Sequence, residues 1–403
     1  MSQTAILGSA PTVRGDWIGR LFLTRLLRQL ALGQLTVRLP SGEELVGAGA
    51  GSGPEATLFL HRWRALRQLV LGGDVGFAEA FMDGDWSSPD LPALIELAAR
   101  NQDALGDSIT GTTAMRLLNR VMHRWHANTK RGSRLNIVSH YDLGNDFYES
   151  WLDRGMSYSS ALFTDPHQYL EEAQEIKQDR VLRHLGVTGA ETVLEIGCGW
   201  GGLAERICAR GCDVTGITLS PAQLDYAQRR FSTPGPKAEI RLQDYRDVNT
   251  VYDRIVSIEM LEAVGVKYWP TYFAKLRACL APGGVAVLQV ITIADEKFSA
   301  YLRSPDFIQR YIFPGGMLPT PSIMQRQIGG AGLSLDTVET FGLSYARTLA
   351  EWRRRFHDAW PRLRASGLDE IFGRKWDYYL AYCEAGFRAG AIDVALYRVT
   401  NPA

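Results

Sequence analysis

Strand-like apolar runs and helix-like amphipathic segments alternate along the second half of the chain. The apolar runs predict strands at 192–196, 213–217, 238–242, 252–258 and 284–293, with late strands at 334–340 and 392–399. Strands that alternate with helices are typical of a parallel sheet with helices on both faces. The pattern therefore predicts an α/β fold with a Rossmann-like sheet.

The first hundred residues contain short predicted helices and strands. Residues 16–35 place Trp17, Leu21 and Leu26 at helical spacing among arginines, which suits either a helix on a lipid surface or an ordinary packing helix. Short strands are predicted at 35–39, 43–49 and 56–60, and helices at 61–71, 77–82 and 91–100. The pattern predicts a small α+β domain over residues 1–105.

A basic linker is predicted at 106–134, before a second domain at 135–403. Arg116, Arg120 and Arg124 share one helix face, and residues 108–141 contain no acidic residue. Such a face attracts anionic lipid headgroups, or is simply solvated or paired within the protein. Nucleic acid is not expected as a partner because no binding motif accompanies the patch.

The composition indicates the cellular compartment but not the binding partners. The chain has 403 residues with 44 basic and 44 acidic side chains, so net charge indicates no partner. Five cysteines without a Cys-x-x-Cys pair fit a reduced, cytoplasmic compartment, and no metal-ligand spacing is present. We see no signal peptide and no apolar run of ~18 residues, so membrane contact is expected to be peripheral, at the inner face.

Residues 193–202 form the most informative stretch. They read Val-Leu-Glu-Ile-Gly-Cys-Gly-Trp-Gly-Gly, a strand followed by a glycine turn and a predicted helix. Gly197, Gly199 and Gly202 match G-x-G-x-x-G, which suits a dinucleotide or S-adenosylmethionine (SAM). A dinucleotide site needs an acid at the end of the second strand, where this chain has Thr218. The stretch therefore favours SAM over NAD, with Glu195 facing the donor's amino acid moiety; a purely structural turn is the other alternative.

Polar residues follow several predicted strands. Glu195, Thr218, Asp244 and Glu262 all fall at strand carboxyl ends, where ligands bind in parallel sheets. Residues 295–327 form a long excursion after the fifth strand, which we expect to cover this site and exclude water.

Six ordered motifs resemble one family. They lie at 139–148, 156–161, 194–202, 216–223, 312–319 and 378–388. Their sequences resemble those of the cyclopropane fatty acid synthases, SAM-dependent methyltransferases that include the mycolic acid cyclopropane synthases. The match covers roughly 135–400. Residues 1–105 resemble the family's N-terminal lipid-associated domain by size and pattern only.

The resemblance implies roles for individual residues. It assigns SAM contacts to Tyr158 and Ser159. The methionine portion of SAM would contact the glycine stretch, which comprises Glu195, Gly197, Cys198, Gly199, Trp200, Gly201 and Gly202. The ribose would contact Thr218, Leu219, Ser220 and Gln223, and the adenine would lie beside Asp244 and Tyr245. The implied methyl acceptor is the double bond of an unsaturated acyl chain in a membrane phospholipid. Methyl transfer leaves a carbocation, and in the family a bound bicarbonate is thought to remove the proton or to assist its removal.

The chain departs from the family at that bicarbonate pocket. Glu262 and Tyr345 are kept, but Ser160 replaces a cysteine, and Ala263 and Ile291 replace histidines. Bicarbonate binding is therefore doubtful, and a methyl-branched or methylene-bearing product is slightly favoured over cyclopropane. As catalytic candidates we take Glu262, Tyr345, Ser160 and Cys383. Cys383 matches a cysteine described as a nucleophile, although a small buried residue is the favoured interpretation.

Two other functions stay open. One is a C-methyltransferase of another hydrophobic small molecule, and the other is a lipid-binding protein with an inactive methyltransferase domain. The intact glycine turn and Glu195 argue against the second. The sequence decides neither double-bond position, headgroup preference nor homo-oligomerisation.

Overall fold

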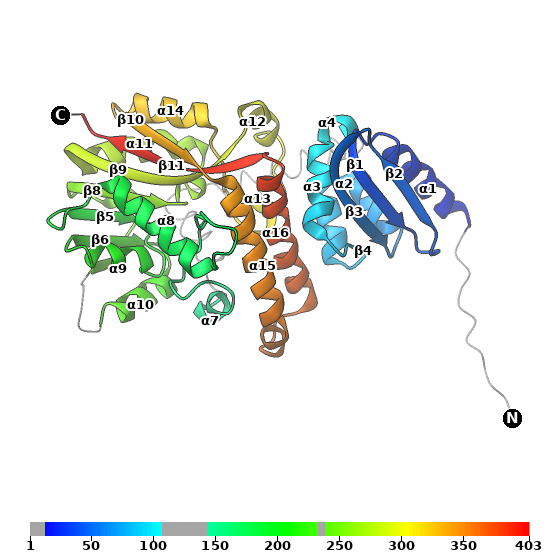
Figure 1. Ribbon diagram of the computed structural model, residues 1–403, viewed down its shortest axis with the longest axis horizontal. Helices are drawn as coiled ribbons and strands as arrows, with labels where there is room; N and C mark the ends of the chain where they lie inside the picture. Colours follow the sequence, from blue (N-terminus) through cyan, green and yellow to red (C-terminus); the bar gives the residue numbers. More distant parts are fainter. Residues whose placement is uncertain (1–12, 107–142, 233–237, 403) are drawn as a thin grey trace. The chain divides into compact units, whose positions relative to one another are not determined.

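The computed structural model describes residues 13–106, 143–232 and 238–402, with side chains from residue 16 onward, and divides into two compact units (Figure 1). The units are Met1–Met115 and Arg116–Ala403. The predicted basic face of Arg116, Arg120 and Arg124 lies outside the described residues. Each unit has its own sheet.

The first unit is a small α+β domain. Its sheet has the order β2-β1-β3-β4, with β1 and β3 parallel and the other pairs antiparallel. Helix α3 packs on β1 and β3. The elements are α1 (Val13–Leu27), β1 (Leu32–Arg38), β2 (Glu44–Ala48), β3 (Gly51–Leu60), α2 (Arg64–Met82), β4 (Trp86–Ser87), α3 (Leu91–Arg100) and α4 (Gln102–Leu105).

Three predicted helices of this unit differ in extent from the structure. The amphipathic segment 16–35 is helical only to Leu27, because the Asn101 side chain accepts from the backbone N–H groups of Ala31 and Leu32 and holds the turn into β1. The helices predicted at 61–71 and 77–82 form one element, α2. Gly73 interrupts it with φ 65° and ψ −143°, a conformation that favours glycine.

Helix α1 leaves part of its apolar surface in solvent. Leu23, Leu26 and Leu27 are buried against the unit. Trp17, Ile18 and Leu21 are 65%, 64% and 56% exposed, and the helical spacing of these three places them on one side. Arg25 is also exposed and falls within the same arc.

The second unit contains a seven-stranded sheet in the order β10-β11-β9-β8-β5-β6-β7. Its strands are β5 (Thr192–Ile196), β6 (Asp213–Thr218), β7 (Ala238–Leu242), β8 (Tyr252–Ile258), β9 (Leu280–Ile293), β10 (Ser334–Thr340) and β11 (Ile392–Thr400). Its α-helices are α7 (Asn145–Glu149), α8 (Leu170–Leu185), α9 (Gly202–Cys208), α10 (Pro221–Arg230), α11 (Trp269–Cys279), α12 (Asp295–Tyr301), α13 (Phe307–Tyr311), α14 (Pro321–Gly330), α15 (Gly342–Ala365) and α16 (Glu370–Arg388).

The sheet is mixed rather than wholly parallel. Strands β5 to β9 run parallel, but β11 lies between β9 and β10 and is antiparallel to both. The expectation of a parallel sheet is therefore wrong for the last strand, while all seven predicted strands exist.

Helices cover both faces of the sheet. Helices α9 and α10 connect β5, β6 and β7 in one direction across the sheet, and α11 connects β8 to β9 in the opposite direction. Right-handed crossovers then place α11 on the face opposite α9 and α10. Helix α8 contacts α9, and α14 contacts α11. The excursion at 295–327 is thus partly a sheet-covering layer, because it includes the start of α14.

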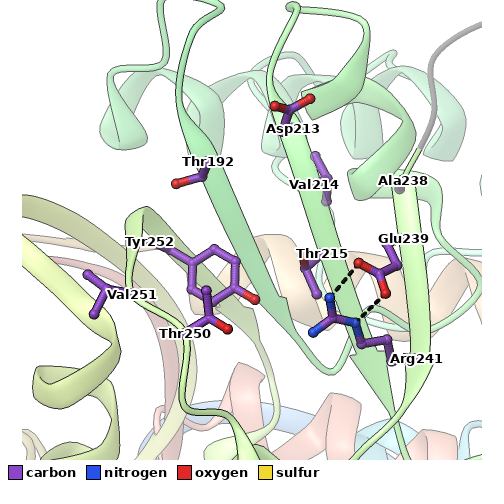
Figure 2. Close-up of a pocket in the computed structure, with 10 residues that line it drawn as sticks. All are labelled: Thr192, Asp213, Val214, Thr215, Ala238, Glu239, Arg241, Thr250, Val251 and Tyr252. Atoms are coloured by element: carbon purple, nitrogen blue, oxygen red, sulfur yellow. Dashed lines mark hydrogen bonds and ion pairs between the residues drawn. The ribbon is translucent and has the colours of Figure 1, made fainter.

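The connection from β7 to β8 contains only the short 3-10 turn η2 (Tyr245–Asp247). The described part of the chain consequently supplies no crossover helix between these strands. A pocket of about 500 Å³ lies beside β6, β7 and the end of this connection (Figure 2). Its lining includes Asp213 and Thr215 of β6, Glu239 and Arg241 of β7 and the segment 250–252. Thr192, Asp213, Ala238 and Tyr252 each begin a strand, so this pocket lies toward the amino ends of the strands.

Candidate active site

The glycine turn joins β5 to α9. Gly197, Gly199 and Gly201 have φ of 82°, 53° and 84°, which suits glycine at all three positions. A Cβ on Gly197 would approach the Met260 side chain, and one on Gly202 would clash with the Gly155 carbonyl oxygen. A Cβ on Gly199 would meet nothing within 4 Å, so this residue faces open space.

Trp200 and Cys198 anchor that turn. The Trp200 ring is buried, and its Nε1 donates to Asn145 Oδ1 of α7 at 2.8 Å. Cys198 packs with Ala227 and Ile240. The turn is therefore held on both sides by residues far away in the sequence.

Glu195 lies beneath the turn, with only 3% of its surface exposed. Its carboxylate accepts from the backbone N–H of Ala204, in the first turn of α9. Its Oε2 has no partner among the described residues. Burial raises the pKa of Glu195 to about 8, although the Lys177 ammonium opposes that rise.

The residues after β6 bond to one another. Thr218 Oγ1 donates to Gln223 Oε1 at 2.7 Å, and Ser220 Oγ accepts from the Gln223 backbone N–H as the cap of α10. Leu219 between them is half-buried. The predicted ribose segment is thus a rigid strand-to-helix turn at the same sheet edge as the glycine turn.

The two residues after β7 have different surroundings. Asp244 forms a hydrogen-bonded ion pair with Arg246, whose Nε lies 2.8 Å from Oδ1. The Tyr245 ring is buried edge-on to Tyr272, within the core cluster under the sheet. Asp244 therefore remains at the strand end, while the Tyr245 side chain turns inward.

The segment 156–160 is pinned by helix α8. Gln174 Nε2 donates to the Ser159 carbonyl oxygen, and Lys177 Nζ donates to Ser159 Oγ, both at 2.8 Å. The Tyr158 hydroxyl is 2.9 Å from that of Tyr379 on α16. Lys177 is 3% exposed, and burial lowers its pKa although Glu259, Asp153 and Glu195 counteract this.

Two carboxylates follow β8 and contact the positions that the resemblance aligns with the family's bicarbonate pocket. Glu259 Oε1 accepts from the Ser160 backbone N–H at 2.9 Å and from Gln289 Nε2 at 2.6 Å. Its Oε2 accepts from the Tyr345 hydroxyl at 2.6 Å. Glu262 Oε1 accepts from the Ile291 backbone N–H at 2.6 Å.

This arrangement does not fit a bound bicarbonate. Ser160 N–H and Tyr345 O–H, two donors that an anion there would use, already bond to Glu259, and the Ser160 hydroxyl donates to the Ala161 carbonyl oxygen. A second anion would also face the charged carboxylate of Glu259. The doubt raised by the sequence thus has a structural reason that the sequence did not supply.

The environments of the two carboxylates differ. Burial raises the pKa of Glu262 to about 8, and the neighbouring Glu259 adds to that rise. Burial also raises the pKa of Glu259, but Tyr345, Ser160, Lys177 and Gln289 favour its charged form. Glu262 has one oxygen without a partner among the described residues. We therefore assign the proton of this pair to Glu262 near neutral pH and the charge to Glu259.

Cys383 lies close by on α16. The residue is half-buried, and burial raises the pKa of its thiol well above the usual range. A thiol that keeps its proton is a poor nucleophile, which agrees with the packing interpretation.

The excursion after β9 also reaches this site. The Met317 backbone N–H donates to the Glu262 carbonyl oxygen at 2.8 Å, and Gln309 Nε2 donates to the Gly316 carbonyl oxygen at 2.9 Å. Residues 316–317 are thus held against the turn that carries Glu262.

Sequence reasoning missed Lys177, Glu259 and Gln289. One available signal was Gln174, Lys177 and Gln178 on the otherwise apolar side of α8, and another was a second acid three residues before Glu262. Gln289 gave no local signal, because it lies within an apolar strand.

Comparisons with known proteins identify the family. Residues 128–397 match the model of the mycolic acid cyclopropane synthetase family. The chain belongs to this family. It is 40% identical to the tuberculostearic acid methyltransferase UfaA1 of Mycobacterium tuberculosis, over 92% of this chain and 88% of that protein. It is 36% identical to the cyclopropane-fatty-acyl-phospholipid synthase of Escherichia coli K12, over 83% and 84%.

Solved structures agree. The cyclopropane synthase MmaA2 of M. tuberculosis superposes with a TM-score of 0.62 at 32% identity, covering 66% of this chain and 98% of that one. The mycolic acid cyclopropane synthase CmaA1, in complex with S-adenosylhomocysteine (SAH), gives 0.63 at 30%, with the same coverage. The protein is thus a SAM-dependent methyltransferase of a family that modifies fatty acids. The open side of Gly199, at the same sheet edge as Thr218 and Asp244, fits this methyl donor.

Proposed function

We propose that the protein transfers the methyl group of SAM to the double bond of an unsaturated acyl chain in a membrane phospholipid. One observation carries this proposal. The open glycine turn and the Glu259–Glu262 pair follow adjacent strands, β5 and β8, at the carboxyl edge of one sheet. The chain that carries both features is 40% identical to a tuberculostearic acid methyltransferase.

The residues of the glycine turn, the β6 turn and Asp244 hold the donor in this proposal. Tyr158 supplies an aromatic ring near the sulfonium charge, and Ser159 fixes that loop. An alkene is a weak nucleophile, so its alignment with the donor and the exclusion of water supply most of the catalysis. Glu262 and Tyr345 line the reacting centre, and the segment around Met317 belongs to its cover.

The product we favour is a methylene-bearing or methyl-branched chain rather than cyclopropane. The misfit of bicarbonate supports this choice. Methyl transfer followed by proton loss is redox-neutral, so the chain keeps one unsaturation or gains one ring. A saturated methyl branch needs a hydride from a further reducing reaction.

Helix α1 supports a membrane-bound substrate. Trp17, Ile18 and Leu21 present an apolar side with Arg25 beside it, the composition that binds anionic lipid surfaces. None of the described helices is long and apolar enough to cross a membrane. We accordingly place the protein at the cytoplasmic membrane surface, with residues 1–105 as its lipid-associated domain and 135–403 as its catalytic domain.

Product analysis tests the reaction. The protein is incubated with SAM and vesicles of mono-unsaturated phosphatidylglycerol, and in parallel with the free fatty acid. We expect one CH2 added to the phospholipid chain, and NMR of the released chain to show an exomethylene or a methyl branch. A ring would contradict the favoured product. Methylation of the free acid alone would contradict the phospholipid. SAH binding without any lipid methylation would favour another hydrophobic acceptor.

Vesicle sedimentation tests the surface. The double variant Trp17→Ser, Leu21→Ser should lose binding to anionic vesicles, while Leu343→Ser, which changes a residue 74% exposed on α15, should keep it. High salt should weaken binding by the parent protein. Equal loss in both variants would argue against a specific role for α1.

A further inference from the structure

We infer that the Glu259 carboxylate is the base that accepts the proton released after methyl transfer, in the place where the family resemblance puts a bicarbonate. This inference rests on the proposed function and names the residue that completes it. Glu259 belongs to none of the motifs that carry the resemblance, and it lies beside them only in the folded chain.

The first argument is hydrogen-bond geometry. A carboxylate and a bicarbonate both present planar, negatively charged oxygens to donors. Glu259 receives three: Ser160 N–H, Gln289 Nε2 and Tyr345 O–H, at 2.6–2.9 Å. A carboxylate accepts at about four lone-pair sites, so one site remains, on the Oε2 that only Tyr345 occupies. That site can take a proton without breaking a bond to the protein.

The second argument is the backbone. Glu259 has φ 51°, and Met156 is the only other residue except glycine with positive φ in the described chain. This conformation is strained for a residue with a side chain and persists where the surroundings enforce it. The Glu259 N–H donates to the Gln289 carbonyl oxygen at 2.8 Å, which fixes the turn. Such strain is concentrated at functional sites.

The third argument is charge. Lys177 and the three donors stabilise the anion, whereas Glu262, 2.6 Å from the Ile291 N–H, keeps its proton more readily. Two carboxylates with different environments divide into one base and one neutral group. Burial raises the pKa of Glu259, which strengthens it as a base.

The step balances without a co-reactant. The bond between the sulfonium sulfur and the methyl carbon breaks, its electron pair stays on sulfur, and the alkene electrons form the new carbon–carbon bond. The adjacent carbocation is discharged when a C–H bond gives its proton to Glu259 Oε2. The electron pair of that C–H bond becomes a carbon–carbon double bond or closes a ring, and Glu259 later releases the proton to water.

The experiment compares the parent protein with Glu259→Gln and Glu259→Gly in CO2-free buffer, with and without added bicarbonate. Glu191→Gln is the matched control, because Glu191 is also buried and accepts several hydrogen bonds but lies just before β5, at the opposite edge. Calorimetry with SAH confirms that each variant folds and binds.

We expect parent activity to be independent of bicarbonate and Glu259→Gln to lose about 100-fold or more in kcat, the scale of a lost general base. Glu259→Gly frees the three donors, so bicarbonate should restore part of its activity. Glu191→Gln should keep the parent kcat.

A parent rate that rises with bicarbonate would overturn the inference, and this result needs no variant. A folded Glu259→Gln with the parent rate, or a folded Glu259→Gly that bicarbonate does not help, would also overturn it. A parent protein that methylates no lipid would instead refute the proposed function.

Discussion

Replacing Glu195 by glutamine should remove the pH dependence that this buried carboxyl imposes on stability. The pKa of Glu195 rises from 4.5 in the unfolded chain to about 8 in the folded protein. Between these values the folded state holds a proton that the unfolded state has lost, so stability falls as pH rises. Glutamine does not titrate, and the Glu262 contribution cancels between the two proteins.

The magnitude follows from the shift. Each pH unit within the window changes the stability difference by about 1.4 kcal/mol, so Glu195→Gln should gain roughly 3 kcal/mol on the parent between about pH 5 and 7.5. The new amide N–H groups take the place of the unpartnered Oε2 and cost about 1–3 kcal/mol if unbonded. That cost does not vary with pH, so the quantity to compare is the slope of the stability difference against pH.

Urea unfolding at several pH values measures the difference in the free energy of unfolding between the variant and the parent. Because the chain has two units, the transition to follow is the one that SAH shifts to higher urea. Glu191→Gln is the control. Burial raises the pKa of Glu191, but hydrogen bonds from Thr188 and Gly189 bring it to about 2, so its carboxylate is charged in both states over this range. A Glu195→Gln difference as flat with pH as that control would refute the reasoning.

Three further substitutions probe the site. Gly199→Val should abolish SAH binding in calorimetry, because the valine side chain would fill the open space beside the turn and a valine backbone is strained at φ 53°. Unchanged affinity for SAH would exclude the turn as the donor site. Tyr345→Phe removes a hydrogen bond that stabilises the Glu259 anion, so the acidic limb of the kcat–pH profile should move to higher pH; an unmoved limb would separate Tyr345 from the base. Asn145→Leu leaves Trp200 Nε1 without its acceptor and should cost about 1–3 kcal/mol in urea unfolding, with weaker SAH binding; unchanged stability would mean that this hydrogen bond does not hold the turn.

Much of the fold was readable from local pattern. The strands 192–196, 238–242, 252–258 and 334–340 have the predicted bounds, because turn residues flank each short run. The direction of β11 was not readable, since it depends on where the chain returns after α15 and α16. The break at Gly73 within α2 was readable from the Gly72-Gly73-Asp74 run, but the return to helix directly after it was not.

The site divides in the same way. Residues at strand ends, such as Thr218 and Asp244, are brought to one edge by topology alone. The Glu259 contacts join segments separated by 99 residues to Ser160 and 86 to Tyr345, so no local period encodes them. Roles that depend on such contacts appear only in the folded chain.

The left-handed backbone at Glu259 also limits how this site can change during evolution. Most residues at φ 51° carry strain that glycine avoids, so glycine is the replacement that the turn accepts most readily. Glutamate and glycine codons differ at their middle base only. A single-nucleotide change could therefore convert a site with a tethered carboxylate into one open to a diffusible anion, or the reverse, without rebuilding the turn.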